Sequence, residues 1–144
     1  MSRFNNKRVV ITGAAGGIGQ VLVVLFCNEG ASVMASDLDT NKLETLTKGW
    51  RKKGYDVTGF AANLAKKDDC EAIISAAIET MGGLDILINN AGIIPRGTIL
   101  ETTDEMWFSA MNVNLNAVFF LCRAAIPHMQ AAGKGAIVNT SSVW

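Results

Sequence analysis

A glycine-rich segment near the N-terminus has the composition and spacing of a phosphate-binding loop. An apolar stretch at residues 8–12 leads into the sequence TGAAGGIG, which runs from Thr12 to Gly19. Glycine permits a tight turn and a close approach to a diphosphate, and a helix that starts there offers free N–H groups and a positive dipole end. No Lys followed by Ser or Thr comes after the last glycine, so this is not a nucleoside-triphosphate loop. Alone, the segment could be a plain turn, but its place between a strand and a helix predicts dinucleotide binding.

A single carboxylate is placed to recognise the ribose of such a cofactor. Asp37 closes the second apolar stretch, eighteen residues after Gly19. A carboxylate at that position accepts hydrogen bonds from the ribose diol and repels a 2′-phosphate. No Arg or Lys lies in the glycine loop or directly beside Asp37, which is followed by Leu38. NAD is therefore the expected cofactor, in preference to NADP. The alternative is that Asp37 is an exposed turn residue.

Two amides follow a later apolar stretch. The sequence Asn-Asn-Ala-Gly at residues 89–92 comes directly after residues 84–88, which are a strand candidate. The carboxyl ends of parallel strands form the binding crevice of such sheets. Two amides and a glycine at that point could hold loops around a cofactor, although a simple strand-end turn is an alternative.

These candidate residues need a scaffold in which strands and helices alternate. Apolar stretches predict strands at residues 8–12, 31–36, 57–61, 84–88 and 136–139. Helical spacing predicts helices from 18 to about 29, at 41–53, at 70–81, from about 105, and at 115–129. Alternation of this kind predicts an α/β fold, a doubly wound parallel sheet with helices on both faces. The aromatic residues Trp107, Phe108, Phe119 and Phe120 are expected in the core.

Composition limits the partners and the compartment. The 144 residues suit one domain, residues 1–144, and 49% hydrophobic with 18% charged residues excludes disorder. The formal net charge is zero, so no basic field attracts nucleic acid or an anionic membrane. Glycines interrupt the apolar run at residues 9–27, which argues against a membrane span or a signal peptide. We therefore expect a cytoplasmic protein.

Cysteine and histidine usage predicts neither a disulfide framework nor a metal site. Cys27, Cys70 and Cys122 lie far apart in the sequence, and His128 is the one histidine of the chain. An odd number of unpaired cysteines is typical of reduced thiols, and one histidine makes a Cys/His zinc site unfavourable. The mean hydropathy of +0.26 is high for a water-soluble domain and indicates apolar surface that a partner would cover.

Together these segments resemble the short-chain dehydrogenase/reductase family. The family's T-G-x-x-x-G-I-G is found at residues 12–19 and its N-N-A-G at 89–92. Its V-N-L is found at 113–115, with Trp107 upstream, and its serine strand at 137–142. The resemblance covers nearly the whole chain. It implies a Rossmann-like fold, hydride transfer between a nicotinamide and a small-molecule alcohol or carbonyl substrate, and a homo-oligomeric enzyme.

The resemblance also implies roles for individual residues. Asn114 corresponds to the asparagine that supports a proton-relay water, and Ser142 to the serine that hydrogen-bonds the substrate oxygen. Asn63 stands where the family often has an aspartate that contacts adenine. The implied cofactor-binding residues are Gly13, Gly17, Ile18, Gly19, Asp37, Asn63, Asn89, Ala91 and Gly92.

One departure from the family concerns the acid/base. The family uses a tyrosine, with a lysine four residues later, and both follow the serine. The only tyrosine here is Tyr55, which is followed by Asp-Val-Thr-Gly, and a phenol with an unperturbed pKa near 10 is a poor base at pH 7. We therefore expect the N-terminal part of an enzyme, truncated after about the fifth strand and inactive in isolation. The alternative is a non-catalytic dinucleotide-binding or interaction fragment.

Overall fold

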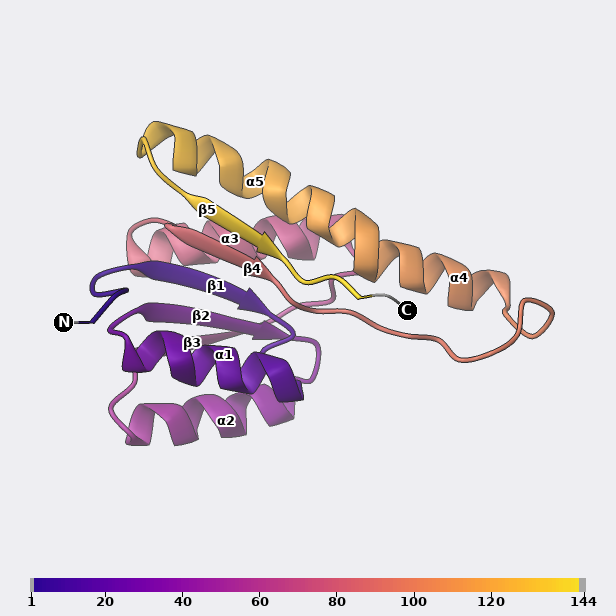
Figure 1. Ribbon diagram of the computed structural model, residues 1–144, viewed down its shortest axis with the longest axis horizontal. Coiled ribbons are helices and arrows are strands. Elements are labelled where there is room, and N and C mark those ends of the chain that lie inside the picture. Colours follow the sequence, from indigo (N-terminus) through magenta and orange to yellow (C-terminus); the bar gives the residue numbers. More distant parts are fainter. Residues whose placement is uncertain (1, 143–144) are drawn as a thin grey trace.

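The computed structural model describes residues 2–142 and contains a five-stranded parallel sheet in the order β3-β2-β1-β4-β5 (Figure 1). The predicted α/β, doubly wound architecture is confirmed. The strands are β1 (Arg8–Thr12), β2 (Ser32–Asp37), β3 (Val57–Ala61), β4 (Ile86–Asn89) and β5 (Ala136–Asn139). The helices are α1 (Gly17–Asn28), α2 (Thr40–Lys52), α3 (Lys67–Met81), α4 (Asp104–Met111) and α5 (Ala117–Ala131), with a π-helical turn η1 (Asn112–Asn116) between the last two.

The sheet buries a separate apolar core on each face. In β1, Val9 and Ile11 belong to the cluster formed with α1 and α2, whereas Val10 belongs to the cluster formed with α3 and α5. This division follows from the period of two in a strand, which sends successive side chains to opposite faces. Figure 1 shows α1 and α2 below the strands, α3 behind β4 and β5, and α5 along the top. Because β1 is covered on both faces, its three central residues, Val9, Val10 and Ile11, are all apolar and buried.

The fourth strand is displaced from its predicted position. The ladder between β1 and β4 begins at Val9 opposite Ile86, so Leu84 and Asp85 precede the strand although both are buried. The apolar pattern at residues 84–88 indicates which residues are buried, not which residues pair with a neighbouring strand. Because buried residues precede the hydrogen-bonded ladder, the strand starts later than the pattern predicts. Similarly, β2 covers 32–37, one residue later than predicted.

A single long helix replaces the two that the sequence predicts between residues 105 and 129. The backbone N–H of Ala117 donates to the carbonyl of Asn112, five residues earlier, and this closes the π turn without ending the helix. No glycine interrupts the sequence from 104 to 131. The chain therefore accommodates the polar segment Asn112–Asn116 as a bulge in a continuous helix, in the way that π turns commonly occur.

The prediction that the aromatic residues of this helix lie in the core is wrong for three of them. Trp107, Phe108 and Phe119 are 57%, 61% and 56% exposed, and Phe120 is partly buried against the core. The residues of α5 that face the core are spaced four apart, and they are Ala117, Leu121, Ala125 and Met129. A helix that lies on one face of a sheet buries only one such stripe, so the aromatic residues on its other sides stay accessible.

By length and composition alone, the helix from Asp104 to Ala131 could also cross a membrane. In its most apolar stretch the mean hydropathy is 1.2, and 17% of the residues in that stretch are buried. Its inner stripe packs on the sheet, and Arg123 lies near its middle, ion-paired with Glu71 of α3. The sequence-based expectation that no membrane is involved stays a prediction.

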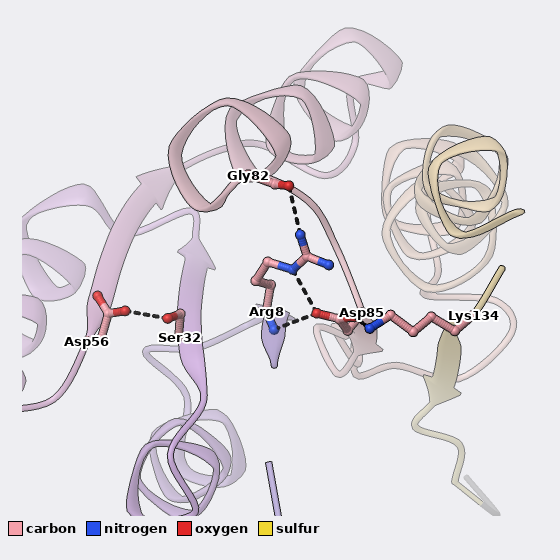
Figure 2. A network of polar contacts seen from close by, with 6 residues as sticks. All are labelled: Arg8, Ser32, Asp56, Gly82, Asp85 and Lys134. Atoms are coloured by element: carbon pink, nitrogen blue, oxygen red, sulfur yellow. Dashed lines mark hydrogen bonds and ion pairs between the residues drawn. The ribbon is translucent and has the colours of Figure 1, made fainter. Parts of the chain in front are cut away.

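A polar network closes the amino-terminal end of the sheet (Figure 2). Asp85 is 5% exposed and accepts hydrogen bonds from the backbone N–H and the Nε of Arg8, at 3.0 and 2.7 Å. The Nζ of Lys134 lies 3.4 Å from its other oxygen. The hydrogen bonds from Arg8 hold the pKa of Asp85 well below its usual range. Because Lys134 precedes β5, the network connects three strands. Figure 2 also shows the Ser32 hydroxyl donating to Asp56.

Candidate functional site

A hollow of about 460 Å³ lies at the carboxyl ends of β1, β2 and β4. Its walls are the glycine loop, the ends of β2 and β3, the first turn of α2, and the segment after β4. The structure brings eight of the nine sequence-predicted cofactor residues together there, namely Gly13, Gly17, Ile18, Gly19, Asp37, Asn63, Ala91 and Gly92. This is the crevice at which a doubly wound sheet binds ligands.

The amino terminus of α1 offers donors to an anion. The helix begins at Gly17, and its N-cap residue, Gly16, supplies no side-chain hydrogen bond. The first amides of such a helix have no partner within the helix. A Cβ on Gly17 would have nothing within 4 Å, so the space beside this turn is open. The residues present therefore fit the diphosphate of a dinucleotide.

Two other glycines let backbone segments pack closely. Gly13 has φ +64°, and a Cβ there would lie 2.8 Å from Cα of Ala91. A Cβ on Gly19 would collide with the carbonyl of Gly13 and would lie 2.7 Å from Cα of Ala14. Gly13 thus lets the loops after β1 and β4 meet, and Gly19 lets α1 pack on the glycine loop.

The Asp37 carboxylate binds the glycine loop to the end of β2. Its Oδ2 accepts a hydrogen bond from the backbone N–H of Ala15 at 2.8 Å, and its Oδ1 accepts one from Asp39 at 3.2 Å. The side chain is half-buried and still lines the hollow. A carboxylate has about four acceptor sites, so Asp37 can also accept hydrogen bonds from a ribose diol.

A cation that sequence reasoning missed lies at the same end of the hollow. Lys42, in the first turn of α2, is exposed and lines the hollow together with Asp37. Lys42 lies five residues after Asp37 in the sequence and is not one of its immediate neighbours. A signal was present, because Asp39 is a good N-cap residue, and a helix that starts there turns Lys42 back toward the strand end. The side chain of Asp39 indeed accepts a hydrogen bond from the backbone N–H of Lys42 at 3.0 Å.

Asn63 enters the hollow from the segment after β3. Its backbone N–H donates to Asp69 at 2.7 Å, and its Oδ1 accepts a hydrogen bond from the N–H of Ala65 at 3.0 Å. Within the described residues, its Nδ2 is left to donate to a ligand.

Thr12 connects the two loops that flank the hollow. It is 1% exposed, and its Oγ1 accepts hydrogen bonds from the backbone N–H groups of Asn90 and Ala91, each at 3.1 Å. The Nδ2 of Asn90 in turn donates to the carbonyl of Thr12 at 3.0 Å. The sequence predicted that the two amides at 89 and 90 could hold loops around a cofactor, and Asn90 lies between the two loops in this way, whereas no role was predicted for Thr12. The available signal was a hydroxyl at the end of an otherwise apolar buried strand, because such a group needs a partner.

The structure does not bring Asn89 into the hollow. Its Nδ2 donates to Oδ1 of Asn139 at 2.8 Å and lies 3.6 Å from Sγ of Cys122. Asn89 is the last residue of β4, and the alternation of that strand directs its side chain toward β5 and α5. Asn90, one residue later, lines the hollow instead.

Asn114 holds the segment that follows β4. Its Oδ1 accepts a hydrogen bond from the N–H of Ile93 at 2.9 Å, and its Nδ2 donates to the carbonyl of Ile93 at 2.8 Å. It belongs to the π turn, and the preceding residue, Val113, lines the hollow. Ser142 is exposed and lies three residues beyond β5. Tyr55 is not among the lining residues, and its hydroxyl donates to Asn28 at 2.8 Å.

Within residues 2–142, no three His, Cys, Asp or Glu side chains gather as a possible metal site. The polar residues that line the hollow are Ser36, Asp37, Asp39, Lys42, Asn63 and Asn90, together with the backbone amides of the glycine loop.

Comparison with known proteins decides the family. The family model described as short chain dehydrogenase matches residues 7–144. The chain belongs to the short-chain dehydrogenase family. Three curated relatives illustrate its range. An uncharacterized oxidoreductase of Thermotoga maritima is 40% identical over 96% of this chain and 55% of its own length. A cyclohexanol dehydrogenase of Acinetobacter is 37% identical over 99% of this chain and 57% of its own length. A 3beta-hydroxysteroid dehydrogenase of Mediterraneibacter gnavus is 35% identical over 99% of this chain and 52% of its own length.

This short-chain dehydrogenase chain spans about half the length of the curated relatives that it matches. Nearly all of it aligns with them, so the shared part includes the glycine loop, the Asn-Asn-Ala-Gly segment and the Asn114 turn.

Proposed function

We propose that this chain is the cofactor-binding part of an oxidoreductase that transfers hydride between a nicotinamide dinucleotide and an alcohol or carbonyl substrate. The observation that carries the proposal is the hollow at the carboxyl ends of the strands, where the uncapped start of α1 faces Asp37 and Asn63. Family membership supports it, because the named relatives are oxidoreductases and dehydrogenases.

Each wall of the hollow recognises one part of the dinucleotide. The amides at the start of α1 hold the diphosphate, since the open space at Gly17 admits it to within hydrogen-bonding distance. Asp37 accepts hydrogen bonds from the adenosine ribose, and the Nδ2 of Asn63 donates to the adenine. Thr12 keeps the two flanking loops in register through Asn90 and Ala91.

NAD is the proposed cofactor, and the preference depends on two carboxylates, Asp37 and Asp39, and one ammonium, Lys42. Asp37 repels the 2′-phosphate of NADP, whereas the exposed ammonium of Lys42 attracts it. Asp37 is half-buried and fixed by two backbone N–H groups, while Lys42 is solvated, so the repulsion dominates. The preference for NAD is consequently smaller than a carboxylate alone would produce.

In the working enzyme, the bound nicotinamide supplies or accepts the hydride. Ser142 hydrogen-bonds the substrate oxygen and orients it, and Asn114 fixes the loop at Ile93 and supports a relay water. Neither residue has a pKa suited to delivering a proton at neutral pH, and Tyr55 is engaged with Asn28. The 144 residues therefore bind cofactor but do not turn over substrate by themselves.

We also propose that the enzyme is a cytoplasmic homo-oligomer that associates through α4 and α5. The outer side of this helix exposes Trp107, Phe108, Leu115 and Phe119, each more than half accessible. An apolar patch of this kind is typical of an interface. Because the side chains come from one rigid helix, two copies could pack against each other through it.

A binding-only role is the second candidate function, and it is favoured by the position of Tyr55, whose hydroxyl donates to Asn28 and which does not line the cofactor hollow. Sequencing the gene beyond codon 144 separates the two. A Tyr-x-x-x-Lys soon after Trp144 supports the enzyme, and the longer product should oxidise NADH with a ketone such as cyclohexanone. Its Ser142→Ala variant should lose most of that activity. A stop codon directly after Trp144 selects the binding fragment.

A further inference from the structure

The order of the strands brings the base of a bound dinucleotide to Asn63. β1, β2 and β3 are neighbours in the sheet (Figure 1). The glycine loop follows β1, Asp37 ends β2, and Asn63 lies two residues after β3. The N–H of Ala62 donates to the carbonyl of Asp37 at 3.0 Å, so the chain passes beside the end of β2 just before Asn63. With the diphosphate at the glycine loop and the ribose at Asp37, which is the proposed function on which this inference rests, the base extends to Asn63.

Apolar side chains line the hollow next to both of these polar residues. Leu38 and Leu64 directly follow Asp37 and Asn63 in the sequence, and both are lining residues. Leu38 is 68% exposed, so a flat base that packs against it would remove apolar surface from water. These side chains can contact the faces of a base, which leaves the amide of Asn63 to contact its edge.

Three hydrogen bonds hold Asn63 and fix the orientation of its amide. The backbone N–H donates to Asp69 at 2.7 Å, and the backbone carbonyl accepts from the N–H of Lys66 at 2.9 Å. The side-chain Oδ1 accepts from the N–H of Ala65 at 3.0 Å. Because an amide nitrogen cannot accept a hydrogen bond, the contact with Ala65 identifies the oxygen end of the side chain. Nδ2, which has no partner among the described residues, is the group left for the base.

A donor at this position discriminates between the atoms of a purine edge. Adenine carries an amino group at position 6, which donates, beside ring nitrogens that accept. A 6-oxopurine carries an oxygen at position 6, which accepts. A free asparagine amide can bond adenine at the amino group and a ring nitrogen together, but that arrangement uses Oδ1, which Ala65 occupies here. Nδ2 therefore bonds adenine at a ring nitrogen, whereas on a 6-oxopurine it can also bond the oxygen.

We propose that Asn63 acts as a hydrogen-bond donor to the base, and that this chain binds a dinucleotide with a 6-oxopurine base at least as tightly as NAD. Asn63 is then a specificity-determining residue of the cofactor hollow. The amino group of adenine makes no hydrogen bond with its side chain, so replacing that amino group by an acceptor costs no affinity.

Calorimetric titration of the folded chain with three dinucleotides tests the proposal. They are NAD, deamino-NAD, in which hypoxanthine replaces adenine, and etheno-NAD, in which a fused ring turns the amino donor into an acceptor nitrogen. The wild type should bind deamino-NAD as tightly as NAD or up to about tenfold more tightly, which is the range of one hydrogen bond. It should bind etheno-NAD within about threefold of NAD.

Asn63→Asp is the matched variant. Its carboxylate keeps an acceptor for the N–H of Ala65 and puts a second oxygen in place of Nδ2. The added charge acts equally on all three dinucleotides, so the ratios of their affinities isolate the hydrogen bond to the base. The variant should bind NAD about tenfold more tightly than etheno-NAD, because the acceptor nitrogen of the fused ring then meets an oxygen. Asn41→Asp adds the same charge to an exposed position of α2 outside the hollow, and it should leave every ratio unchanged.

Three results would overturn the proposal. The first is wild-type binding of NAD more than about threefold tighter than that of deamino-NAD, which would show that the amino group is recognised. The second is the same ratio of NAD to etheno-NAD affinity in the wild type and in Asn63→Asp. Either result leaves NAD binding, and with it the proposed function, intact. The third is failure of all three dinucleotides to bind the folded wild type, which would overturn the proposed function as well.

Discussion

Arg8 donates two hydrogen bonds to the buried carboxylate of Asp85, one from its backbone N–H and one from Nε. Around this pair, the N–H of Asp85 donates to the carbonyl of Arg8, and the N–H of Ala136 donates to the carbonyl of Asp85. The pair thereby connects β1, β4 and β5 at the end of the sheet opposite the cofactor hollow. It gives the first prediction, which concerns stability.

Asp85→Asn should lower the free energy of unfolding by roughly 3 kcal/mol, because it leaves Arg8 beside a neutral group in a mostly buried position. Acid should have a related effect. The pKa of Asp85 lies below its unfolded value of about 3.9, so its contribution is complete above that pH and is lost as the pH falls below it.

Urea titrations at neutral and acid pH measure both effects. Glu44→Gln is the matched control, because it removes a carboxylate from an exposed pair on α2. Its stability should change by less than about 0.5 kcal/mol. Equal losses of unfolding free energy for the two variants would show that the buried pair stabilises the fold no more than the exposed pair does.

A second prediction compares two glycines of the loop that differ in how much room a Cβ would have. Gly19→Ala should destabilise the fold by about 2 kcal/mol or more, because its Cβ would collide with the backbone of Gly13 and Ala14. Gly17→Ala should leave stability unchanged or raise it slightly, because nothing lies within 4 Å. Thermal unfolding measures both. Similar melting temperatures for the two variants would refute the close approach of α1 to the loop.

A third prediction concerns cofactor choice. Asp37→Asn should weaken NAD binding and strengthen NADP binding, each about tenfold, because it removes the repulsive charge and weakens the hydrogen bonds to the ribose. Lys42→Gln should weaken NADP binding and leave NAD binding nearly unchanged. Calorimetric titration of both variants with both cofactors measures the effects. If Lys42→Gln weakens both cofactors equally, Lys42 does not recognise the 2′-phosphate.

A fourth prediction concerns association. Phe119→Lys places a charge in the exposed apolar side of α5 and should shift the chain toward monomer. Sedimentation measures the change, and Gln130→Lys, on the exposed part of the same helix, is the control. An unchanged distribution for Phe119→Lys would place the interface elsewhere.

The sequence predicts the fold well because its signals are local and repeated. Strands covered on both faces must be apolar at nearly every position, and β1 shows this in Val9, Val10 and Ile11. The glycines of the loop are equally informative, since few other structures need that spacing. These two signals place the glycine-loop residues of the cofactor hollow, and the spacing from Gly19 adds Asp37, whereas Asn63, Ala91 and Gly92 were expected from the family resemblance.

The misplaced residues depend on relationships that a linear sequence shows weakly or not at all. The π turn at 112–116 changes the rotation of α5 relative to α4. This rotation decides which aromatic residues of the long helix face the core. Whether Asn89 or Asn90 enters the hollow depends on where the β4 ladder ends. Lys42 reaches the hollow only because Asp39 fixes the first turn of α2. The end of the β4 ladder depends on its neighbouring strands, whereas the π turn and the cap at Asp39 are local features whose sequence signals are weak.

The central claim is that the open amide turn at the start of α1 binds the diphosphate of a nicotinamide dinucleotide. Calorimetric titration of the folded chain with NAD, for wild type and for Gly17→Val, tests it most directly. We predict saturable binding of one NAD by the wild type and loss of binding by the variant, with folding retained because the space at Gly17 is open. A folded wild-type chain that does not bind NAD, or a variant that binds it equally well, would contradict the account.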